Sequence, residues 1–432
     1  MGRSRVFGQG RKTRRGAAPG RHGGCMAAAV IRVPESESDP AITHEATRRS
    51  LSEAGLPGGS DLMRFRPLAE GRPVPVPRLL ADSADPARLD GHISGLLAIG
   101  HLLVEDGEAD HIVLDGATGR VFSMYLFEKR PDLIEVLPLA PSLEALTRFL
   151  EAAAELTGLH GRFAHFAGRF GARAVADASA LFLSLLDTGD GGDWDGGWGS
   201  AGDREDWEHA LPALWRVVAL VRPLALIAGP GGGLLLDLPE GLLEEEFAPE
   251  GVVRFDEAEL PAALVHEPTR RFLTRTGLPK DGPMFLLDTE APLLPTLARC
   301  RAESERGEQL YAFPEDMAVA PDRLIRLGYL VDDAYVVIDA DTGALHAWYV
   351  SDAALRPLNA DVSTLAFTVW MLRREEEIDQ EHDLTADMYH PLAGTMAAVL
   401  ASVDPVACRP TGEADDWRYW PEVFHDEAGG VL

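Results

Sequence analysis

The phrase HEATRRSLSEAGLP at residues 44–57 occurs again as HEPTRRFLTRTGLP at residues 266–279. Nine of the fourteen positions are identical, and the two phrases lie 222 positions apart. The match extends upstream without a gap, since VIRVPESES from Val30 aligns with VVRFDEAEL from Val252. A repeat of this length is much longer than a solenoid unit, so it predicts a duplicated domain in which each copy buries its own core.

Each copy of the phrase carries the signals of a capped amphipathic helix that follows a short strand. An acidic residue, Glu45 or Glu267, stands in the first turn, where it favours the positive end of the helix dipole. Gly55 and Gly277 provide the left-handed residue that ends a helix, and a proline stands two positions later. The fourth residue after each histidine is arginine, so the second histidine of a zinc-protease helix is missing.

A β-hairpin is the second repeated block. Two apolar runs flank Asp-x-x-Thr-Gly in HIVLDGATGRVFSMYL (111–126) and again in YVVIDADTGALHAWYV (335–350). Asp115 and Asp339 can accept backbone N–H groups across the turn, and the glycine of each motif suits a position with φ above zero. Just upstream, each copy has one further apolar run. Three adjacent strands in this order predict an antiparallel meander.

Helices follow the hairpin in both copies. PLAPSLEALTRFLEAAAELTG from Pro138 parallels PLNADVSTLAFTVWMLRREEE from Pro357, with Ser142 and Asp361 as N-cap residues. An alanine-rich helix comes next, and an Asp-Trp phrase closes each copy. We expect the aromatic residues of that phrase to hold a terminal segment against the body. The sequence therefore predicts an α+β fold with two tandem domains, each an antiparallel β-meander flanked by helices.

The repeat divides the chain into four parts, which are a basic leader at 1–29, a first domain at 30–220 with an acidic Gly/Trp-rich loop at 187–208, a join at 221–251 and a second domain at 252–432. The leader lacks the apolar segment of a secretory signal. We expect a disordered arm or an over-extended gene start, with Met26 as the alternative start. The join is rich in glycine but has neither P-loop nor dinucleotide-binding spacing, and it predicts a hairpin between two apolar strands.

The chain is strongly acidic, with 40 basic and 69 acidic side chains in 432 residues and a formal charge of −29. Such a body repels nucleic acid and anionic lipid and attracts basic proteins, although excess charge also serves solubility alone. No apolar run reaches the roughly 18 residues that a membrane span needs. Three scattered cysteines indicate a reducing cytoplasm, without a disulfide framework or a thiolate metal site.

The residue types that enzymes bring together are dispersed along this sequence. The thirteen histidines are scattered, and the late pair His382 and His390 stands eight residues apart, which is too far for a shared metal ion. The G-x-S-x-G elbow of a serine hydrolase is absent. We therefore expect no catalytic residue, no metal and no cofactor.

Runs of acidic residues are the candidate partner-binding positions. Residues 187–208 contain eight acids, three tryptophans and one arginine, and two shorter acidic runs follow later in the chain. Aromatic anchors ringed by carboxylates suit the capture of a basic protein, whereas a solvated loop and solvated helix faces are the alternative interpretation. The candidates are Asp193, Trp194, Asp195, Trp198, Glu244, Glu245, Glu246, Glu375, Glu376 and Glu377.

In their order along the chain, these motifs resemble a known family. RRFLTRTGLP, the hairpin IGHLLVEDG with HIVLDGATGRVF, the helix PLAPSLEALTRFL and the closing DDWRYWPEVFHDE are similar to the SUKH superfamily, in its fourth immunity-protein group. The resemblance implies an α+β fold and a non-enzymatic role. It also implies a cytoplasmic bacterial immunity protein that binds and neutralises polymorphic toxins, often nucleases or nucleic-acid deaminases. The matching motifs fall on structural positions, so they assign no binding residue.

Three functions stay open on the sequence. An immunity protein would bind a basic nuclease or deaminase and occlude it with acidic surface, through fast and salt-sensitive association. A non-enzymatic interaction scaffold with a regulatory partner is the alternative, and a cryptic hydrolase is the third. A toxin gene beside this one would separate the first two functions. Loss of an activity on mutating one residue would indicate the third.

Overall fold

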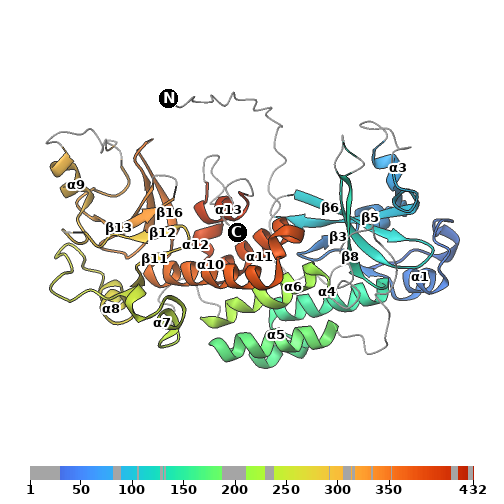
Figure 1. The fold of residues 1–432 in the computed structure, drawn as a ribbon, viewed down its shortest axis with the longest axis horizontal. Helices are drawn as coiled ribbons and strands as arrows, with labels where there is room; N and C mark the ends of the chain where they lie inside the picture. Colours follow the sequence, from blue (N-terminus) through green and yellow to red (C-terminus); the bar gives the residue numbers. More distant parts are fainter. Residues whose placement is uncertain are drawn as a thin grey trace.

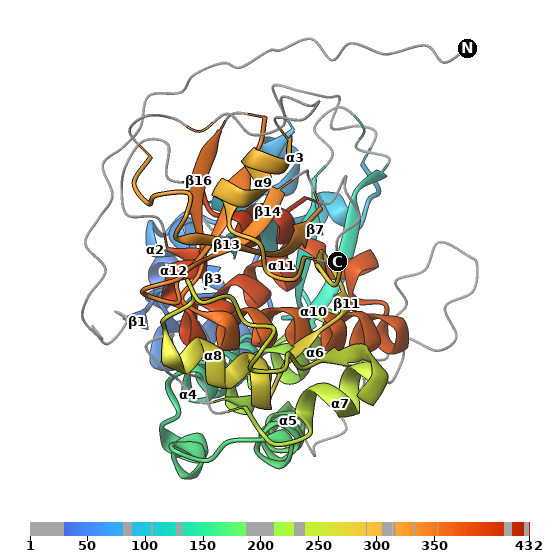
Figure 2. The ribbon, with the colours of Figure 1, turned by 90° about the vertical axis from the view of Figure 1, so that its left-hand side faces the viewer.

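The computed structural model describes residues 30–80, 89–104, 107–126, 130, 133–186, 211–228, 238–290, 292–304, 313, 317–331, 334–351, 353–409, 417–426 and 432. Over these residues the fold is α+β, as predicted, with antiparallel strand pairing in two large sheets. Figure 1 shows the sheets toward opposite ends of the molecule, with the long helices between and below them. Figure 2 shows that most helices gather on one side of the sheets.

Both copies contain the predicted antiparallel meander. The first sheet has the order β3-β5-β6-β7-β8, and β4 also pairs with β5. Its strands are β3 (Met63–Arg64), β4 (Val74–Pro75), β5 (Leu96–Val104), β6 (Gly107–Asp115), β7 (Val121–Tyr125) and β8 (Glu135–Ala140). The second sheet runs from β11 to β16 in sequence order. Its strands are β11 (Asp281–Gly282), β12 (Phe285–Leu287), β13 (Leu324–Leu330), β14 (Ala334–Asp339), β15 (Leu345–Tyr349) and β16 (Ala354–Asn359).

The helices are unequal in length, and the longest follow the sheets. Those before the join are α1 (Glu45–Arg49), α2 (Arg66–Ala69), α3 (Val76–Leu79), α4 (Leu143–Gly158), α5 (Ala172–Leu186) and α6 (Ala213–Val221). Helix α7 (Leu242–Phe247) lies within the join, and those after the join are α8 (Glu267–Arg275), α9 (Leu297–Ser304), α10 (Val362–His382), α11 (Leu384–Val403), α12 (Pro405–Cys408) and α13 (Tyr419–Phe424). Short 3₁₀ helices occupy Glu35–Glu37, Ile93–Gly95, Gly161–Phe166, Arg222–Ile227 and Pro249–Gly251.

The N-caps predicted for α4 and α10 are confirmed. The Ser142 hydroxyl accepts the backbone N–H of Ala145 at 3.1 Å. The Asp361 carboxylate accepts the N–H groups of Ser363 at 2.8 Å and Thr364 at 3.1 Å. These bonds satisfy N–H groups that the first turn of a helix leaves without an intrahelical partner.

The repeated phrase folds in the same way twice. In each copy the two-residue strands before and after its helix pair with each other, β1 (Val30–Ile31) with β2 (Leu56–Pro57) and β9 (Val252–Val253) with β10 (Leu278–Pro279). Gly55 and Gly277 have φ values of 76° and 81°, so the predicted left-handed stop is confirmed. The copies differ at Ser50–Ala54, where the first widens into a π-helix and α8 of the second stays α-helical.

The start of α1 packs directly on the turn of the first hairpin. The His44 ring nitrogen Nδ1 and the Thr47 hydroxyl are hydrogen-bonded at 2.9 Å, and the His44 backbone N–H donates to the carbonyl of Gly116 at 2.9 Å. Gly119 of the turn lies against this pair with φ 79°, so an added β-carbon would fall within 3.0 Å of both side chains. Only glycine fits that position.

The second copy repeats this contact. The His266 Nδ1 atom and the Thr269 hydroxyl are 2.8 Å apart, and the His266 N–H donates to the carbonyl of Ala340 at 3.0 Å. Gly343, with φ 77°, closes against both side chains. The two sequence motifs that recur, the helix phrase and the hairpin turn, are therefore the two sides of one contact.

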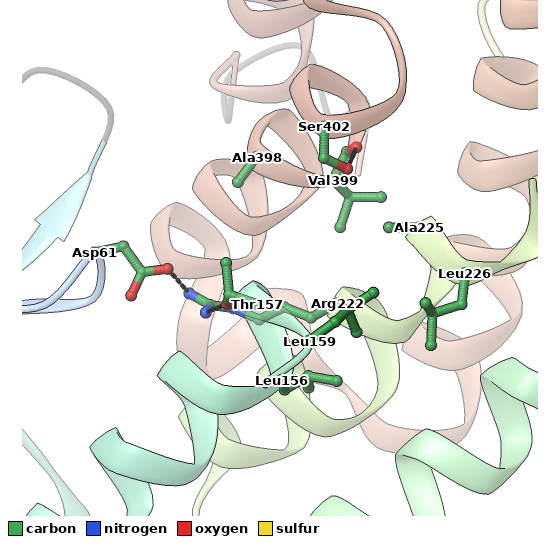
Figure 3. A pocket seen from close by; sticks show the side chains of 10 residues that line it. All are labelled: Asp61, Leu156, Thr157, Leu159, Arg222, Ala225, Leu226, Ala398, Val399 and Ser402. Atoms are coloured by element: carbon green, nitrogen blue, oxygen red, sulfur yellow. Dashed lines mark hydrogen bonds and ion pairs between the residues drawn. The ribbon is translucent and has the colours of Figure 1, made fainter. Parts of the chain in front are cut away.

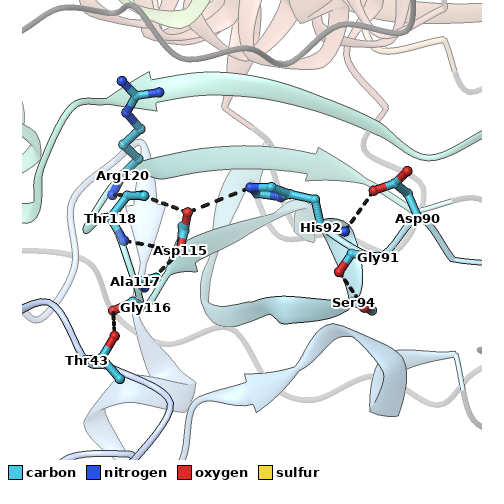
Figure 4. A network of polar contacts seen from close by, with 10 residues as sticks. All are labelled: Thr43, Asp90, Gly91, His92, Ser94, Asp115, Gly116, Ala117, Thr118 and Arg120. Atoms are coloured by element: carbon cyan, nitrogen blue, oxygen red, sulfur yellow. Dashed lines mark hydrogen bonds and ion pairs between the residues drawn. The ribbon is translucent and has the colours of Figure 1, made fainter.

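An aspartate orders each turn from within, as predicted. Figure 4 shows the first turn, where Asp115 accepts the N–H of Ala117 at 2.9 Å and the hydroxyl of Thr118 at 2.7 Å. Burial acts to raise the pKa of Asp115, but the hydrogen bonds from Thr118 and the backbone outweigh it, so this pKa lies below its ordinary value. The pKa of Asp339 also lies below its ordinary value. Burial acts to raise it, and the hydrogen bond from the Arg323 guanidinium at 2.8 Å does most to lower it.

Each sheet has one face in a large core and a second, smaller cluster on its other face. The small cluster of the first sheet includes Val76, Phe122 and Met124. That of the second sheet includes Leu297 and Trp348. Helices α3 and α9 contribute the residues that cover these outer faces, Val76 and Leu297.

The two copies do not bury separate cores, so that expectation was wrong. One continuous cluster of buried residues extends through both copies. Helix α6 of the first copy packs along α11 of the second, and the guanidinium of Arg216 donates to the carbonyl of His382 at 3.1 Å. Trp215 on α6 is fully buried, and its indole N–H donates to the carbonyl of Leu139 at 2.7 Å. The duplicated units are therefore fused by the helices between the sheets.

The hairpin predicted for the join is also corrected. Its first apolar run, at Arg222–Ile227, is a 3₁₀ helix, and α7 follows at Leu242–Phe247. A short apolar run fits a buried helix as well as a buried strand, and here the neighbours α6 and α11 supply a helical environment. The glycine run of the join lies outside the described residues.

Two glycine substitutions, one at the helix–turn contact and one in helix α11, should change the free energy of unfolding in opposite directions. Gly343→Ala places a side chain at positive φ against His266 and Thr269, and should lower the free energy of unfolding by about 1–3 kcal/mol. Gly394→Ala in α11 meets no atom within 4 Å and should raise it by up to about 1 kcal/mol. Denaturant titration of both variants checks this, and a neutral Gly343→Ala would contradict the contact.

Candidate functional site

The predicted partner-binding residues fall in three groups, of which the structure describes two. Asp193, Trp194, Asp195 and Trp198 lie outside the described residues, so their role stays a prediction. The glutamates of α7 and those of α10 are described. The sequence separates these two groups by more than a hundred residues, and the fold brings them together.

Helices α7 and α10 lie against each other, and one arginine connects their acids. The Arg374 guanidinium on α10 lies 3.9 Å from the Glu246 carboxylate on α7 and also pairs with Glu377. A shallow groove at this junction is lined by residues of both helices and of β11. Its lining residues are Glu246, Phe247, Ala248, Asp281, Gly282, Pro283, Arg373 and Glu376. We call this groove, together with the neighbouring glutamates of α7 and α10, the acidic groove.

Arginines neutralise part of the acidic groove. Glu244 pairs with Arg254, and Glu376 pairs with Arg373 at 2.9 Å. Glu245 is exposed to solvent. The paired carboxylates are held in fixed positions, so the groove presents ordered acids whose field is weaker than their number suggests.

Burial changes the ionisation of Glu246. Its side chain is only 7% exposed. This burial raises the pKa of Glu246 to about 7, opposed by the charge of Arg374 and assisted by that of Glu377. Near neutral pH the carboxyl is therefore partly protonated and can act as a hydrogen-bond donor as well as an acceptor.

Glu375 is not suited to touch a partner directly. It is 1% exposed, and neither carboxyl oxygen has a hydrogen-bond partner among the described residues. Burial raises its pKa to about 8, with further contributions from Asp379 and Glu376, so the folded protein keeps this carboxyl protonated at neutral pH. The three glutamates are consecutive in the sequence, but on a helix consecutive side chains point in different directions, so they do not share one face.

Sequence reasoning missed two pockets that form where the copies meet. The first is largely apolar, and Figure 3 shows it between α4, the 3₁₀ helix Arg222–Ile227 and α11. Asp61 and Thr157 both contact the Arg222 guanidinium at its edge, the carboxylate at 2.7 Å. This pairing orders the guanidinium at the boundary between the copies.

The second pocket is polar. Strands β6, β7 and β8 of the first sheet contribute Asp110, Ser123, Tyr125, Glu135 and Leu137, and the start of α11 contributes Thr385, Ala386, Asp387, Met388, Tyr389, His390 and Pro391. We call it the inter-copy pocket.

Helix α11 is bent where it lines the inter-copy pocket. Pro391 has no N–H for the carbonyl of Asp387, and its ring crowds that carbonyl. Met388 accordingly has non-helical angles, φ −141° and ψ 37°. The Tyr-His-Pro sequence inside a helical pattern is a local signal of this bend. The strand partners of the pocket have no such signal, because they come from the other copy.

The described residues give little support to other kinds of site. Among them no group of three or more His, Cys, Asp and Glu side chains is placed to hold a metal ion. Within the same residues no helix is long and apolar enough to cross a membrane. Cys300 and Cys408 are both buried thiols, and burial raises the pKa of Cys300 above its ordinary value.

A family model matches the chain twice, over residues 4–180 and 238–426. It is the model of the SUKH-4 immunity protein. The chain belongs to the SUKH-4 immunity protein family. Each of the two SUKH regions covers most of one copy of the repeat, so the resemblance seen in the sequence is confirmed. No curated protein and no solved structure matches the chain.

The SUKH-4 matches divide the candidate residues. Both glutamate runs, on α7 and on α10, lie inside the second match. The acidic Gly/Trp-rich segment at 187–208 lies between the matches and outside both of them. The inter-copy pocket needs both matched regions, since its walls come from one copy each.

The buried carboxyl of Glu375 predicts a pH-dependent stability difference. Its pKa is raised from 4.5 to about 8 on folding, so the folded state binds a proton that the unfolded chain has released. Stability linked to this proton is complete below about pH 4.5 and falls as the pH rises toward 8. The free energy of unfolding of Glu375→Gln, relative to that of the native chain, should therefore increase from pH 5 to pH 7, by up to roughly 2 kcal/mol.

Urea titrations at pH 5, 6, 7 and 8 measure this difference. Glu381→Gln, at an exposed glutamate of the same helix, is the matched control and should give a difference that is flat with pH. A flat difference for Glu375→Gln as well would show that the buried carboxyl is ionised in the folded protein.

Proposed function

We propose that this SUKH-4 protein works in the bacterial cytoplasm by binding a protein toxin and blocking its action. The observation that carries the proposal is the family match, which occurs twice and covers most of the chain. A non-enzymatic role accords with the absence of a catalytic constellation from the sequence motifs. The tandem arrangement gives one chain two SUKH units fused by a common core.

The toxin is a basic nuclease or nucleic-acid deaminase. Enzymes that act on nucleic acid hold phosphates with basic side chains around the active site. A chain with a formal charge of −29 is attracted to such a surface over a long range, and salt screens that attraction. An acidic protein seated there blocks the active site and repels the nucleic-acid substrate.

The acidic groove is the contact face on the second copy. Glu245 and Glu377 are exposed, and Glu376 lines the groove beside Arg373. Glu375 is buried, so its more exposed neighbours on α10 make the contact instead. The acids and tryptophans of the 187–208 segment remain a second predicted contact, supported by the sequence alone.

Charge removal on the acidic groove tests this assignment. In the full chain, a triple variant with Glu245, Glu376 and Glu377 each changed to Gln should raise the Kd for the cognate toxin at least about tenfold. The main change should be a slower association rate, since partly exposed charges steer encounter more than they hold the complex. Surface plasmon resonance with the toxin captured from native lysate gives both rates, at low and moderate salt.

A matched triple variant separates this face from net charge. Glu53, Glu144 and Glu151 are exposed on the first copy, and changing all three to Gln removes the same charge. Equal losses in both triple variants would overturn the assignment of the face. Capture of a non-toxic regulatory protein instead would favour the scaffold, and turnover of a small molecule abolished by one substitution would favour the hydrolase.

A further inference from the structure

The inter-copy pocket has the acceptors and charges of a site for a cation. Asp110 and Glu135 enter from the first sheet, and Asp387 enters from the bent start of α11. Among the described residues that line it, none is arginine or lysine. Three carboxylates therefore share one concave surface with His390 as the sole lining group that can carry a positive charge.

A buried hydroxyl in this pocket lacks a hydrogen-bond partner among the described residues. Ser123 on β7 is 1% exposed, and its Oγ atom has no hydrogen-bond partner among the described residues. It faces the pocket that Asp110 and Glu135 also line. A buried polar atom without a bond is costly, so a ligand that donates to it gains that energy on binding.

Asp110 lies where burial affects its ionisation. Burial raises its pKa; the charge of His390 opposes this and that of Glu135 adds to it. A carboxyl in this state gains strongly from an added positive charge, because the cation compensates both the lost hydration and the neighbouring carboxylate.

A planar cation with several N–H donors matches the groups that line the pocket. A guanidinium has five N–H donors in a rigid fork, which can serve two carboxylates and a hydroxyl at once. Tyr125 at the same pocket is 44% exposed and offers an aromatic face of the kind that guanidinium groups stack on. An ammonium ion donates only three bonds from one point.

We propose that the inter-copy pocket receives one arginine side chain of the bound partner protein, with Asp110, Glu135 and Ser123 as its acceptors. This inference rests on the proposed function, because it takes a basic protein as the partner. It assigns the pocket to both copies together: the first copy supplies the acceptors, and α11 of the second copy supplies the opposite wall. A single SUKH unit has only one wall of the site.

Methionine-methyl NMR on the full chain tests the pocket without the partner. Met388 lines the pocket, and Met371 in the core of α10 serves as an internal reference. The probe is N-acetyl-arginine amide, compared with its neutral citrulline counterpart. The Met388 methyl signal should shift and saturate with the arginine probe alone, while the Met371 signal stays in place.

Two substitutions and one control complete the test. Asp110→Asn and Ser123→Ala should each raise the Kd for the arginine probe, Asp110→Asn at least about tenfold. Glu151→Gln on the outside of α4 removes the same charge as Asp110→Asn and should leave the Kd unchanged. Unchanged signals of the other methionines show that each variant is folded.

Three results would overturn the inference. They are an unmoved Met388 signal, an equal shift with citrulline, and an unchanged Kd for Asp110→Asn. None of these three results contradicts the proposed function, which is tested by capture of the toxin. Conversely, arginine binding in a chain that captures no toxin would leave the pocket as a guanidinium site and remove the immunity role.

Discussion

The packing of a helix start on a hairpin turn organises each half of this protein. His44 with Thr47, and His266 with Thr269, each form a half-buried pair against which the turn glycine closes. The pair lies between two elements that are about seventy residues apart in the chain. It thereby fixes the helix to the sheet, and with it the two-stranded pair that brackets the helix. The repeated helix phrase and the repeated hairpin turn are the two sides of this contact.

The helix–turn contact also affects how the two copies pack together. With α1 or α8 fixed at the turn of its hairpin, the helices after the meander cover the inner face of the sheet and continue toward the other copy. There α6 and α11 pack along each other and close a single core. Neither sheet has to bury its inner face alone, so the fused core makes the tandem pair one structural unit.

Local features of the fold could be read from the sequence, and non-local ones could not. The helix stops at Gly55 and Gly277 and the N-caps at Ser142 and Asp361 depend on residues within a few positions, and all four are confirmed. The apolar run at Arg222–Ile227 predicts a strand from the sequence but forms a 3₁₀ helix. A short run does not reveal which helices or strands will pack around it.

The same limit applies to the candidate site. The burial of Glu375 depends on elements packed against α10, and nothing in the run RREEE separates it from its exposed neighbours. The inter-copy pocket joins strands near residue 123 to a helix near residue 388, and only the bend at Pro391 has a signal in the sequence.

The two surfaces assigned here suit different steps of one binding event. Acids of the groove that are partly exposed and paired with arginines give little affinity each, but their field accelerates encounter with a basic partner. Affinity needs a few desolvated anchors whose partners are already in place. The inter-copy pocket offers such a place, because its carboxylates and its Ser123 hydroxyl are fixed by two folded units before any partner arrives. A separated SUKH unit would keep much of the steering and lose the anchor, which gives a physical reason for both copies to remain in one chain.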